Sequence, residues 1–169
     1  MRVAIFVSGR GSNMEAILNE KKKGNLPNAE IALVLSDKAD APALEKANAA
    51  GVKTVFVDSK PYRKNREGYD AEVLKVLREH NIEFIVLAGF MRIITPVLIE
   101  AFSHRIINIH PALLPAFPGL HAQKQALDYG VKVSGCTVHF VDAGMDTGPI
   151  ILQTAIPVNP DDTEDTLSA

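Results

Sequence analysis

The stretch Val3-Ala4-Ile5-Phe6-Val7-Ser8-Gly9-Arg10-Gly11-Ser12-Asn13 decides the expected fold. Its first five residues are apolar and mostly β-branched, which is typical of a strand, and a stretch of helical period follows from about Ser12 to Lys22. Glycines between the two let the backbone approach a ligand closely, and free amides at a helix N-terminus favour a phosphate. The stretch therefore predicts a strand, an anion-binding loop and a helix.

The glycine-containing segment also resembles part of the dinucleotide-binding fingerprint, which has three glycines. Met14 stands in the place of the third glycine, and no clear acidic partner for a ribose follows. We therefore expect a monophosphate at this loop and not NAD. A structural role stays open, in which Gly9 and Gly11 only shape a tight turn and Ser12 or Asn13 only caps the helix.

Downstream, short β-branched runs alternate with longer stretches of helical period, which predicts an α/β domain with a doubly wound, largely parallel sheet. The last third changes to two extended runs separated by a glycine-containing loop, which indicates antiparallel strands near the C-terminus. The predicted strands are 3–7, 31–35, 54–57, 84–87, 106–109, 133–141 and 150–156. The predicted helices are about 12–22, 42–50, 68–80, 96–103 and 121–129.

Three further patterns refine this prediction. Ala71, Leu74 and Leu77 recur at intervals of three, and we expect them to form the apolar face of their helix. The segment from His110 to Gly119 contains too many prolines for a regular element, so we expect an irregular loop. Acids and capping residues at 161–165 are typical of a helix N-terminus.

Composition is that of a soluble globular domain, with 169 residues, 47% of them hydrophobic and 22% charged. The net charge of -2 and the lack of a long basic block argue against a nucleic-acid partner. No segment approaches the roughly 18 apolar residues that a membrane span needs, so we expect no membrane partner. The single cysteine, Cys136, cannot form an internal disulfide, and the chain opens without a signal-like segment, which favours the cytoplasm.

Asn108-Ile109-His110 ends the fifth predicted strand. Residues two apart on a strand share a face, so Asn108 and His110 should project together while Ile107 and Ile109 pack on the other side. In open α/β sheets the ligand crevice lies outside the carboxyl ends of the strands, where this pair and the glycine loop should both fall. The alternative is that His110 is only a hydrogen-bonded residue at a strand end.

The third motif is the acidic loop from Asp142 to Pro149, which contains Asp146 and two glycines. A carboxylate brought against His110 would stabilise the protonated imidazole and allow it to carry a proton. An ordinary surface hairpin is the alternative interpretation, because sequence spacing does not show that contact.

These residues together resemble one family along essentially the whole chain. The matching segments are Val7-Ser8-Gly9, Gly11-Ser12-Asn13, Leu87-Ala88-Gly89-Phe90-Met91-Arg92-Ile93, Asn108-Ile109-His110-Pro111, Leu113-Leu114-Pro115, Pro118-Gly119-Leu120-His121, Val138-His139-Phe140-Val141 and Asp146. They resemble the phosphoribosylglycinamide formyltransferases, which are folate-dependent formyltransferases. The resemblance implies a Rossmann-like formyltransferase fold and an enzyme of purine biosynthesis. It implies that 10-formyltetrahydrofolate, as co-substrate, gives its formyl group to the glycine amine of 5'-phosphoribosylglycinamide.

The resemblance also implies roles for individual residues. Asn108, His110 and Asp146 match the family's catalytic trio, and we call them the site trio. The nucleotide phosphate is expected at Gly11, Ser12 and Asn13. The folate is expected at Arg66, Met91, Arg92, Ile93, Ile94, Asn108, Val141 and Asp142. We expect direct attack by the amine through a tetrahedral intermediate, without a metal.

The chain departs from the family pattern at two points. Ile94 stands where leucine is common, and residues 1–169 are expected to form a single formyltransferase domain without the C-terminal helical region of the family. That region normally supplies an acidic contact to the nucleotide. We expect the protein to be a monomer or a homodimer.

Other functions share much of this pattern. Methionyl-tRNA formyltransferases and formyltetrahydrofolate hydrolases have a similar Asn, His and Asp arrangement, but each is expected to carry a further domain. A non-catalytic domain that binds a phosphate ligand is the alternative outside the enzymes. The histidines lack the spacing of zinc sites, which disfavours metal catalysis.

Overall fold

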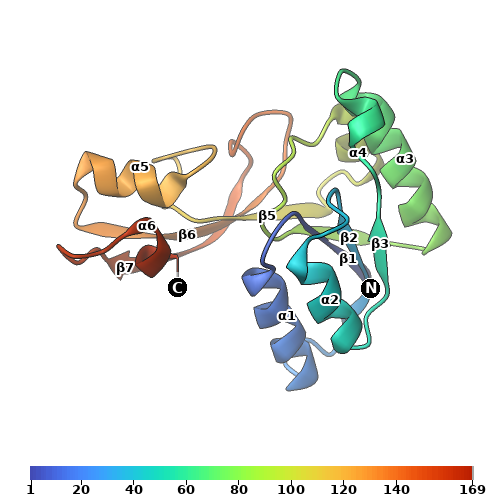
Figure 1. Ribbon diagram of the computed structural model, residues 1–169, viewed down its shortest axis with the longest axis horizontal. Coiled ribbons are helices and arrows are strands. Elements are labelled where there is room, and N and C mark those ends of the chain that lie inside the picture. Colours follow the sequence, from blue (N-terminus) through green and yellow to red (C-terminus); the bar gives the residue numbers. More distant parts are fainter. Residues whose placement is uncertain (169) are drawn as a thin grey trace. The chain divides into compact units, whose positions relative to one another are not determined.

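The structure, a computed structural model, describes residues 1–168 and divides into two compact units, Met1–Ile106 and Ile107–Ala169. In the first unit four parallel strands have the order β3-β2-β1-β4. Figure 1 shows α1 and α2 on one face of these strands and α3 and α4 on the other. The elements are β1 (Arg2–Val7), α1 (Ser12–Lys22), β2 (Glu30–Ser36), α2 (Pro42–Ala49), β3 (Thr54–Phe56), the 3-10 helix η1 (Lys60–Tyr62), α3 (Arg66–Glu79), β4 (Phe84–Leu87) and α4 (Pro96–Ala101).

Burial on both faces explains the composition of the central strands. All side chains from Val3 to Val7 on β1 are buried, as are those from Leu33 to Leu35 on β2. Helices cover both faces of a parallel sheet, so its strands are continuous apolar runs and do not alternate. The glycine loop follows β1 directly and is therefore held at the carboxyl end of the innermost strands.

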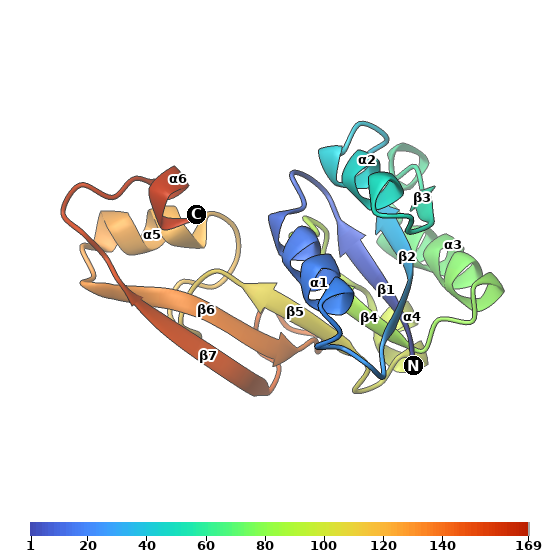
Figure 2. The same ribbon diagram turned by 90° about the horizontal axis from the view of Figure 1, so that it is seen from below.

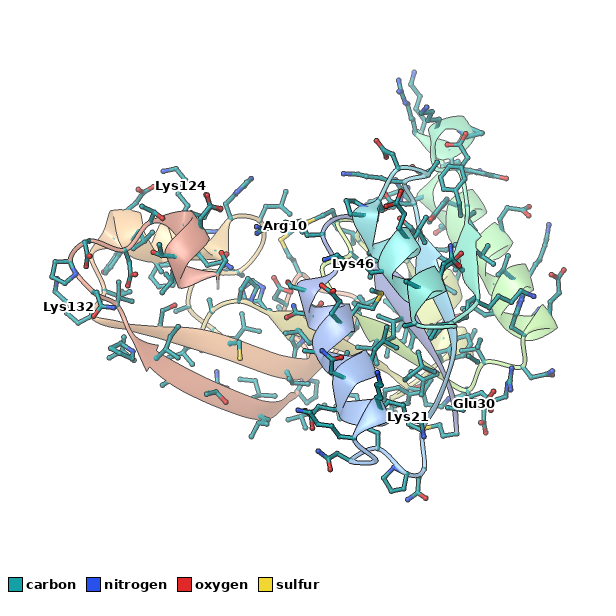
Figure 3. All side chains as sticks on the ribbon, turned by 60° about the horizontal axis from the view of Figure 1, so that its bottom comes forward. Arg10, Lys21, Glu30, Lys46, Lys124 and Lys132 are labelled. Atoms are coloured by element: carbon teal, nitrogen blue, oxygen red, sulfur yellow. The ribbon has the colours of Figure 1, made fainter. Side chains whose placement is uncertain are left out.

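The packing of α1 against α2 fixes the glycine loop. Gly11 precedes α1 with φ 77, and a Cβ at this position would lie 2.6 Å from the Cβ of Ala43 on α2. The Ala43 amide donates to the Gly9 carbonyl at 3.2 Å. Lys46 of α2, labelled in Figure 3, pairs with Glu15 of α1 at 2.6 Å. The left-handed conformation and the close approach both require glycine at position 11.

The buried stripe of α3 differs from the predicted one. Tyr69, Val73 and Leu77 are fully or nearly fully buried, whereas Ala71 and Leu74 are only half-buried. Residues four apart on a helix stay on one face, whereas a series with intervals of three drifts around it. The prediction of Ala71, Leu74 and Leu77 as one face was therefore right only for Leu77.

The second unit is an antiparallel ladder in the order β5-β6-β7. Figure 2 shows α5 and α6 on the same side of this ladder. Its elements are β5 (Ile106–His110), whose first residue ends the first unit, α5 (Ala122–Tyr129), β6 (Val133–Phe140), β7 (Ile150–Pro157) and α6 (Glu164–Leu167). Every residue of β7 is exposed, and among residues 1–168 only β6 pairs with it.

The predicted fold class is confirmed, with parallel strands between helices and then antiparallel strands toward the C-terminus. The helix N-terminus predicted at 161–165 is confirmed by the Thr163 capping box that begins α6. His121 lies outside α5 because its φ of 55 is left-handed. The 3-10 helix η1 was not predicted from the sequence. The assignment of residues 1–169 to a single domain stays a prediction. No helix within residues 1–168 has the length and apolar character to cross a membrane.

Candidate active site

The pairing of β5 with β6 brings four polar side chains to one face of the second unit. Asn108 lies opposite His139, and His110 lies opposite Thr137. Because alternate residues of a strand share a face, the two cross-strand pairs lie side by side. His110, Thr137 and His139 are all buried. The predicted projection of Asn108 and His110 from one face therefore occurs on the side where β6 contributes two more polar groups.

Thr137 connects this face to the proline-containing loop that follows β5. Its hydroxyl donates to the Ala112 carbonyl at 2.7 Å and accepts from the Leu114 amide at 3.0 Å. Gln153 of β7 donates to the Leu114 carbonyl at 2.9 Å. These bonds satisfy backbone groups that would otherwise be buried without partners, which costs free energy. The loop is thus fixed beside the histidines.

Asp146 lies in the loop between β6 and β7, and its carboxylate contacts both other members of the site trio. Oδ2 accepts from the Gly119 amide at 2.8 Å and lies 3.3 Å from His110 Nδ1. Oδ1 accepts from Asn108 Nδ2 at 3.4 Å. The carboxylate is therefore the centre to which the two β5 side chains and the proline-containing loop converge.

Two features of the β6–β7 loop place this carboxylate. Asp142 Oδ1 accepts from the Gly144 amide at 3.0 Å and from the Thr147 hydroxyl at 2.7 Å, which closes the loop tip. A Cβ on Gly148 would lie 1.8 Å from the Phe140 carbonyl oxygen, so only glycine fits there. The two predicted folate residues of this loop, Val141 and Asp142, are both half-buried.

The His110 ring is held by acceptors at both nitrogens. Nε2 lies 2.8 Å from the Phe117 carbonyl oxygen, to which it donates, and Nδ1 faces the Asp146 carboxylate. A carbonyl oxygen has no hydrogen to give, so Nε2 carries a proton. Nδ1 is then the nitrogen that faces Asp146.

A cavity of about 270 Å³ adjoins Asp146 in the second unit. It is lined by Leu114, Pro115, Pro118, Met145, Asp146, Thr147, Gly148 and Ile150. The lining is mostly apolar apart from Asp146 and Thr147.

The first unit contains the glycine loop and the other predicted ligand contacts. Ser8 Oγ donates to Asp37 Oδ1 at 2.6 Å and accepts from the Met91 amide at 2.9 Å, so the loops after β1, β2 and β4 are joined. Ser12 and Asn13 are exposed at the start of α1. Figure 3 labels Arg10 in the same loop. Free amides of a helix N-terminus beside exposed hydroxyl and amide side chains suit an anion.

The predicted folate residues of the first unit differ in exposure. Met91 and Ile93 are 60% and 49% exposed, whereas Ile94 is buried, so Ile94 can offer a ligand little beyond its backbone. The Arg92 guanidinium lies 4.3 Å from the centroid of the Tyr69 ring, within the range of a cation–π contact. Arg66 is exposed at the start of α3.

Tyr69 is the buried partner of Arg92. Burial raises the pKa of the Tyr69 phenol, and the nearby Asp37 carboxylate raises it further. Within residues 1–168, its hydroxyl is the only buried side-chain polar atom without a hydrogen-bond partner. Tyr69 therefore presents a neutral ring face to the Arg92 cation.

The sequence matches the formyl transferase family over residues 1–169. It is 46% identical to the phosphoribosylglycinamide formyltransferase of Bacillus subtilis, over 98% of this chain and 84% of that protein. The chain belongs to the formyl transferase family. The predicted family, that of the phosphoribosylglycinamide formyltransferases, is therefore confirmed.

Two further comparisons place this formyl transferase among its relatives. It is 48% identical to the trifunctional purine biosynthetic protein adenosine-3 of Drosophila pseudoobscura pseudoobscura, covering 99% of this chain but only 12% of that protein. The crystal structure of glycinamide ribonucleotide transformylase 1 from Symbiobacterium toebii has a TM-score of 0.95 and 48% identity. That comparison covers 99% of this chain and 78% of the solved one.

Sequence reasoning missed several groups of this formyl transferase site. His139 belongs to the family motif, but no separate role was predicted for it. Its cross-strand position opposite Asn108 follows from the alternation of Thr137 and His139, but only once the β5–β6 register is known. The contacts of the Gly119 amide with Asp146 and of the Phe117 carbonyl with His110 could not be predicted from residue types, because both groups are backbone atoms.

Proposed function

We propose that this chain transfers the formyl group of 10-formyltetrahydrofolate to the glycine amine of 5'-phosphoribosylglycinamide. The proposal is supported by membership of the formyl transferase family and by similarity to relatives whose names include this activity. The observation that carries it is the convergence of His110 and Asn108 on the Asp146 carboxylate, at 3.3 and 3.4 Å.

In the proposed reaction the amine nitrogen attacks the formyl carbon directly. A new C–N bond forms, and the carbonyl electron pair moves to oxygen to give a tetrahedral oxyanion. Asn108 Nδ2 and protonated His110 donate hydrogen bonds to this oxyanion. One such donor typically contributes ~10²- to 10³-fold in rate.

Collapse of the intermediate breaks the bond between the formyl carbon and the folate nitrogen. The departing nitrogen needs a proton, and the attacking amine loses one. His110 gives its proton to the departing nitrogen and then takes up the proton that the amine loses, so the protons balance and the imidazolium is restored. Asp146 orients the imidazolium and stabilises its charge. No covalent enzyme intermediate is needed.

The ligand-binding residues are proposed on the same basis. Gly11, Ser12 and Asn13 would hold the nucleotide phosphate through backbone amides and short polar side chains. The folate would contact Arg66, the segment Met91–Arg92–Ile93–Ile94, and Asn108, Val141 and Asp142. Exposed Met91 and Ile93 suit contacts with an apolar ring system, and the Arg92 guanidinium suits an anionic or aromatic group.

The direct test is formation of formylated nucleotide when the purified protein is mixed with both substrates. His110→Ala, Asn108→Ala and Asp146→Asn should each lower kcat by about 10²-fold or more, because each removes a charge or donor that acts in the transition state. His80→Ala is the matched control, since His80 Nδ1 also contacts a carbonyl, that of Val76 at 2.8 Å, but lies in the first unit.

Near-normal turnover of Asp146→Asn with intact folding would remove this carboxylate from the mechanism. Formate release without nucleotide would instead indicate hydrolysis of the folate, and formylation of methionyl-tRNA would indicate the tRNA enzyme. Binding of both ligands without any transfer would support a non-catalytic binding domain. The cytoplasmic location, the monomeric or homodimeric state and the metal-free reaction all stay predictions.

A further inference from the structure

His139 is a buried histidine that the proposed chemistry does not use. Its side chain is on β6 directly opposite Asn108, and the residue is 2% exposed. Nδ1 lies 2.9 Å from the Phe140 carbonyl oxygen, and Nε2 lies 3.2 Å from Asn108 Nδ2. Both ring nitrogens therefore have partners, and one of the partners is a member of the site trio.

These two contacts determine which ring nitrogen of His139 carries a proton. The Phe140 carbonyl can only accept, so Nδ1 must be the donor in that bond. In the neutral ring Nε2 then has a lone pair and accepts from the Asn108 amide group. The neighbouring Asp146 Oδ1 is 3.6 Å from Nε2, beyond ordinary hydrogen-bond distance, so the closer partner of this nitrogen is Asn108.

The same contacts select one of the two orientations of the Asn108 amide. Nδ2 faces His139 Nε2 at 3.2 Å and Asp146 Oδ1 at 3.4 Å. The carboxylate oxygen is an acceptor, and Nε2 is an acceptor in the neutral ring whose proton is on Nδ1. A flipped amide would place its oxygen against an imidazole lone pair and a carboxylate oxygen, and two donors would lose their partners. Of the two contacts, the longer one to Asp146 is the weaker.

We propose that neutral His139 is a positioning residue, which holds one hydrogen of the Asn108 amide so that the other hydrogen stays directed toward the reacting oxygen. The inference rests on the proposed function, since it assumes that Asn108 donates to an oxyanion. When that oxyanion forms, it takes over the hydrogen that Asp146 Oδ1 accepts in the free protein. His139 keeps the other hydrogen, so the amide does not turn.

The first experiment compares His139→Leu with His139→Gln. Leucine fills a similar volume but has no hydrogen-bond acceptor, so the Asn108 amide can then flip. We expect kcat to fall at least about tenfold. This loss is a part of the ~10²- to 10³-fold in rate that one oxyanion donor typically contributes. KM for both substrates should stay within about twofold, because the lost interaction is made in the transition state. Glutamine offers a carbonyl oxygen near the position of Nε2 and should recover most of the lost kcat. A Leu variant with unchanged kcat, or a Gln variant as slow as Leu, overturns the proposal.

The second experiment repeats the His139→Leu change in the Asn108→Ala background. If His139 acts through the Asn108 amide, the second substitution should lower kcat by no more than about twofold once that amide is gone. The pH profile of His139→Leu should keep the wild-type shape, since His110 and Asp146 are untouched. If the kcat loss of the double variant equals the product of the losses of the two single variants, or if the pH profile of His139→Leu is displaced, His139 acts on Asp146 or His110. Either result would overturn the proposal.

The third measurement uses the unmodified protein and does not depend on whether a variant folds. Long-range ¹H–¹⁵N NMR correlations of the His139 ring report its tautomer. The neutral Nδ1–H form is expected at the pH of maximal turnover, and an Nε2–H form or an imidazolium would overturn the proposal.

The Asn108→Ala variant separates failure of the positioning role of His139 from failure of the proposed mechanism. If it loses turnover while His139→Leu does not, only the positioning role fails, and if it turns over normally, the proposed mechanism fails first.

Discussion

At the scale of single residues, the site trio depends on a backbone conformation that few residues adopt. Asp146 has φ 55, in the left-handed region, and its carboxylate reaches Gly119, His110 and Asn108 from there. Asp and Asn enter this region more readily than other residues with a side chain. Asp146→Asn should therefore preserve the loop, and a loss of turnover in this variant would reflect the missing charge.

Gly11 allows a second test at this scale. Gly11→Ala places a Cβ 2.6 Å from the Ala43 Cβ in addition to the left-handed φ of 77, so unfolding free energy should fall by about 2–3 kcal/mol. Gly24→Ala is the matched control, because Gly24 has φ 85 but nothing within 4 Å of the added atom, and should cost only about 1 kcal/mol. Urea denaturation measures both. Equal losses would show that Ala43 moves aside without cost.

At the scale of elements, a buried carboxylate joins α3 to the start of α4. Asp70 Oδ2 accepts from the Thr95 amide and from the Thr95 hydroxyl, each at 2.7 Å, and Thr95 is the N-cap of α4. Burial raises the pKa of the Asp70 carboxyl, although the two Thr95 bonds act in the opposite direction. The segment Met91–Ile94 lies just before this cap, so Asp70 also helps to fix the predicted folate contacts.

The raised pKa predicts a pH dependence of stability. Because the folded state binds the Asp70 proton more tightly than the unfolded state, stability from this group is present below about pH 3.9 and is lost as pH rises through the higher folded pKa. In the Asp70→Asn variant, the amide oxygen of the new side chain would still accept both Thr95 bonds. The unfolding free energy of wild type relative to Asp70→Asn should therefore fall between about pH 4 and pH 7.

Urea denaturation at the two pH values measures this difference. Asp128→Asn is the control for the change in net charge, because the Asp128 side chain is 65% exposed on α5. If the difference in unfolding free energy between wild type and Asp70→Asn does not change with pH, this result would contradict the expected direction of the pKa shift of Asp70.

The helices and strands were largely predictable from the sequence, whereas contacts between distant segments were not. The parallel strands and the glycine loop were predicted because continuous apolar runs and breakers act locally. That Asn108 and His110 lie on one face could be predicted because side chains alternate along a single strand. His139 could not be assigned, because its contact with Asn108 depends on the register of two strands whose pairing residues are 31 positions apart. The Asp146 contact depends on a loop conformation, which residue types do not fix.

At the scale of the whole molecule, positive and negative charges nearly balance, and within residues 1–168 the edge strand β7 exposes apolar side chains. The net charge is -2 and the isoelectric point is about 6.2. Ile150, Ile151 and Leu152 of β7 are each about half or more exposed, and the strand carries no charged residue. Edge strands without charges readily pair with other chains, and low net charge removes the repulsion that prevents it.

We therefore expect self-association to be strongest near pH 6.2, the isoelectric point, and to decrease about two pH units above it. Leu152→Lys should reduce light scattering at the isoelectric point more than Tyr129→Lys does. Both variants add one positive charge at an exposed apolar residue, but Tyr129 is on α5 and not on the open strand. If both variants reduce light scattering equally, the association depends on the net charge of the protein and not on β7.

The hydrogen-bond partners of Asp146 have a practical consequence for following unfolding. His110, Asn108 and the Gly119 amide all belong to the second unit. Hydrogen exchange of the Gly119 amide along a denaturant titration thus serves as a local gauge of this unit. Where the exchange curve and a global spectroscopic curve separate, the interval between them measures how far this part of the chain loosens before the rest.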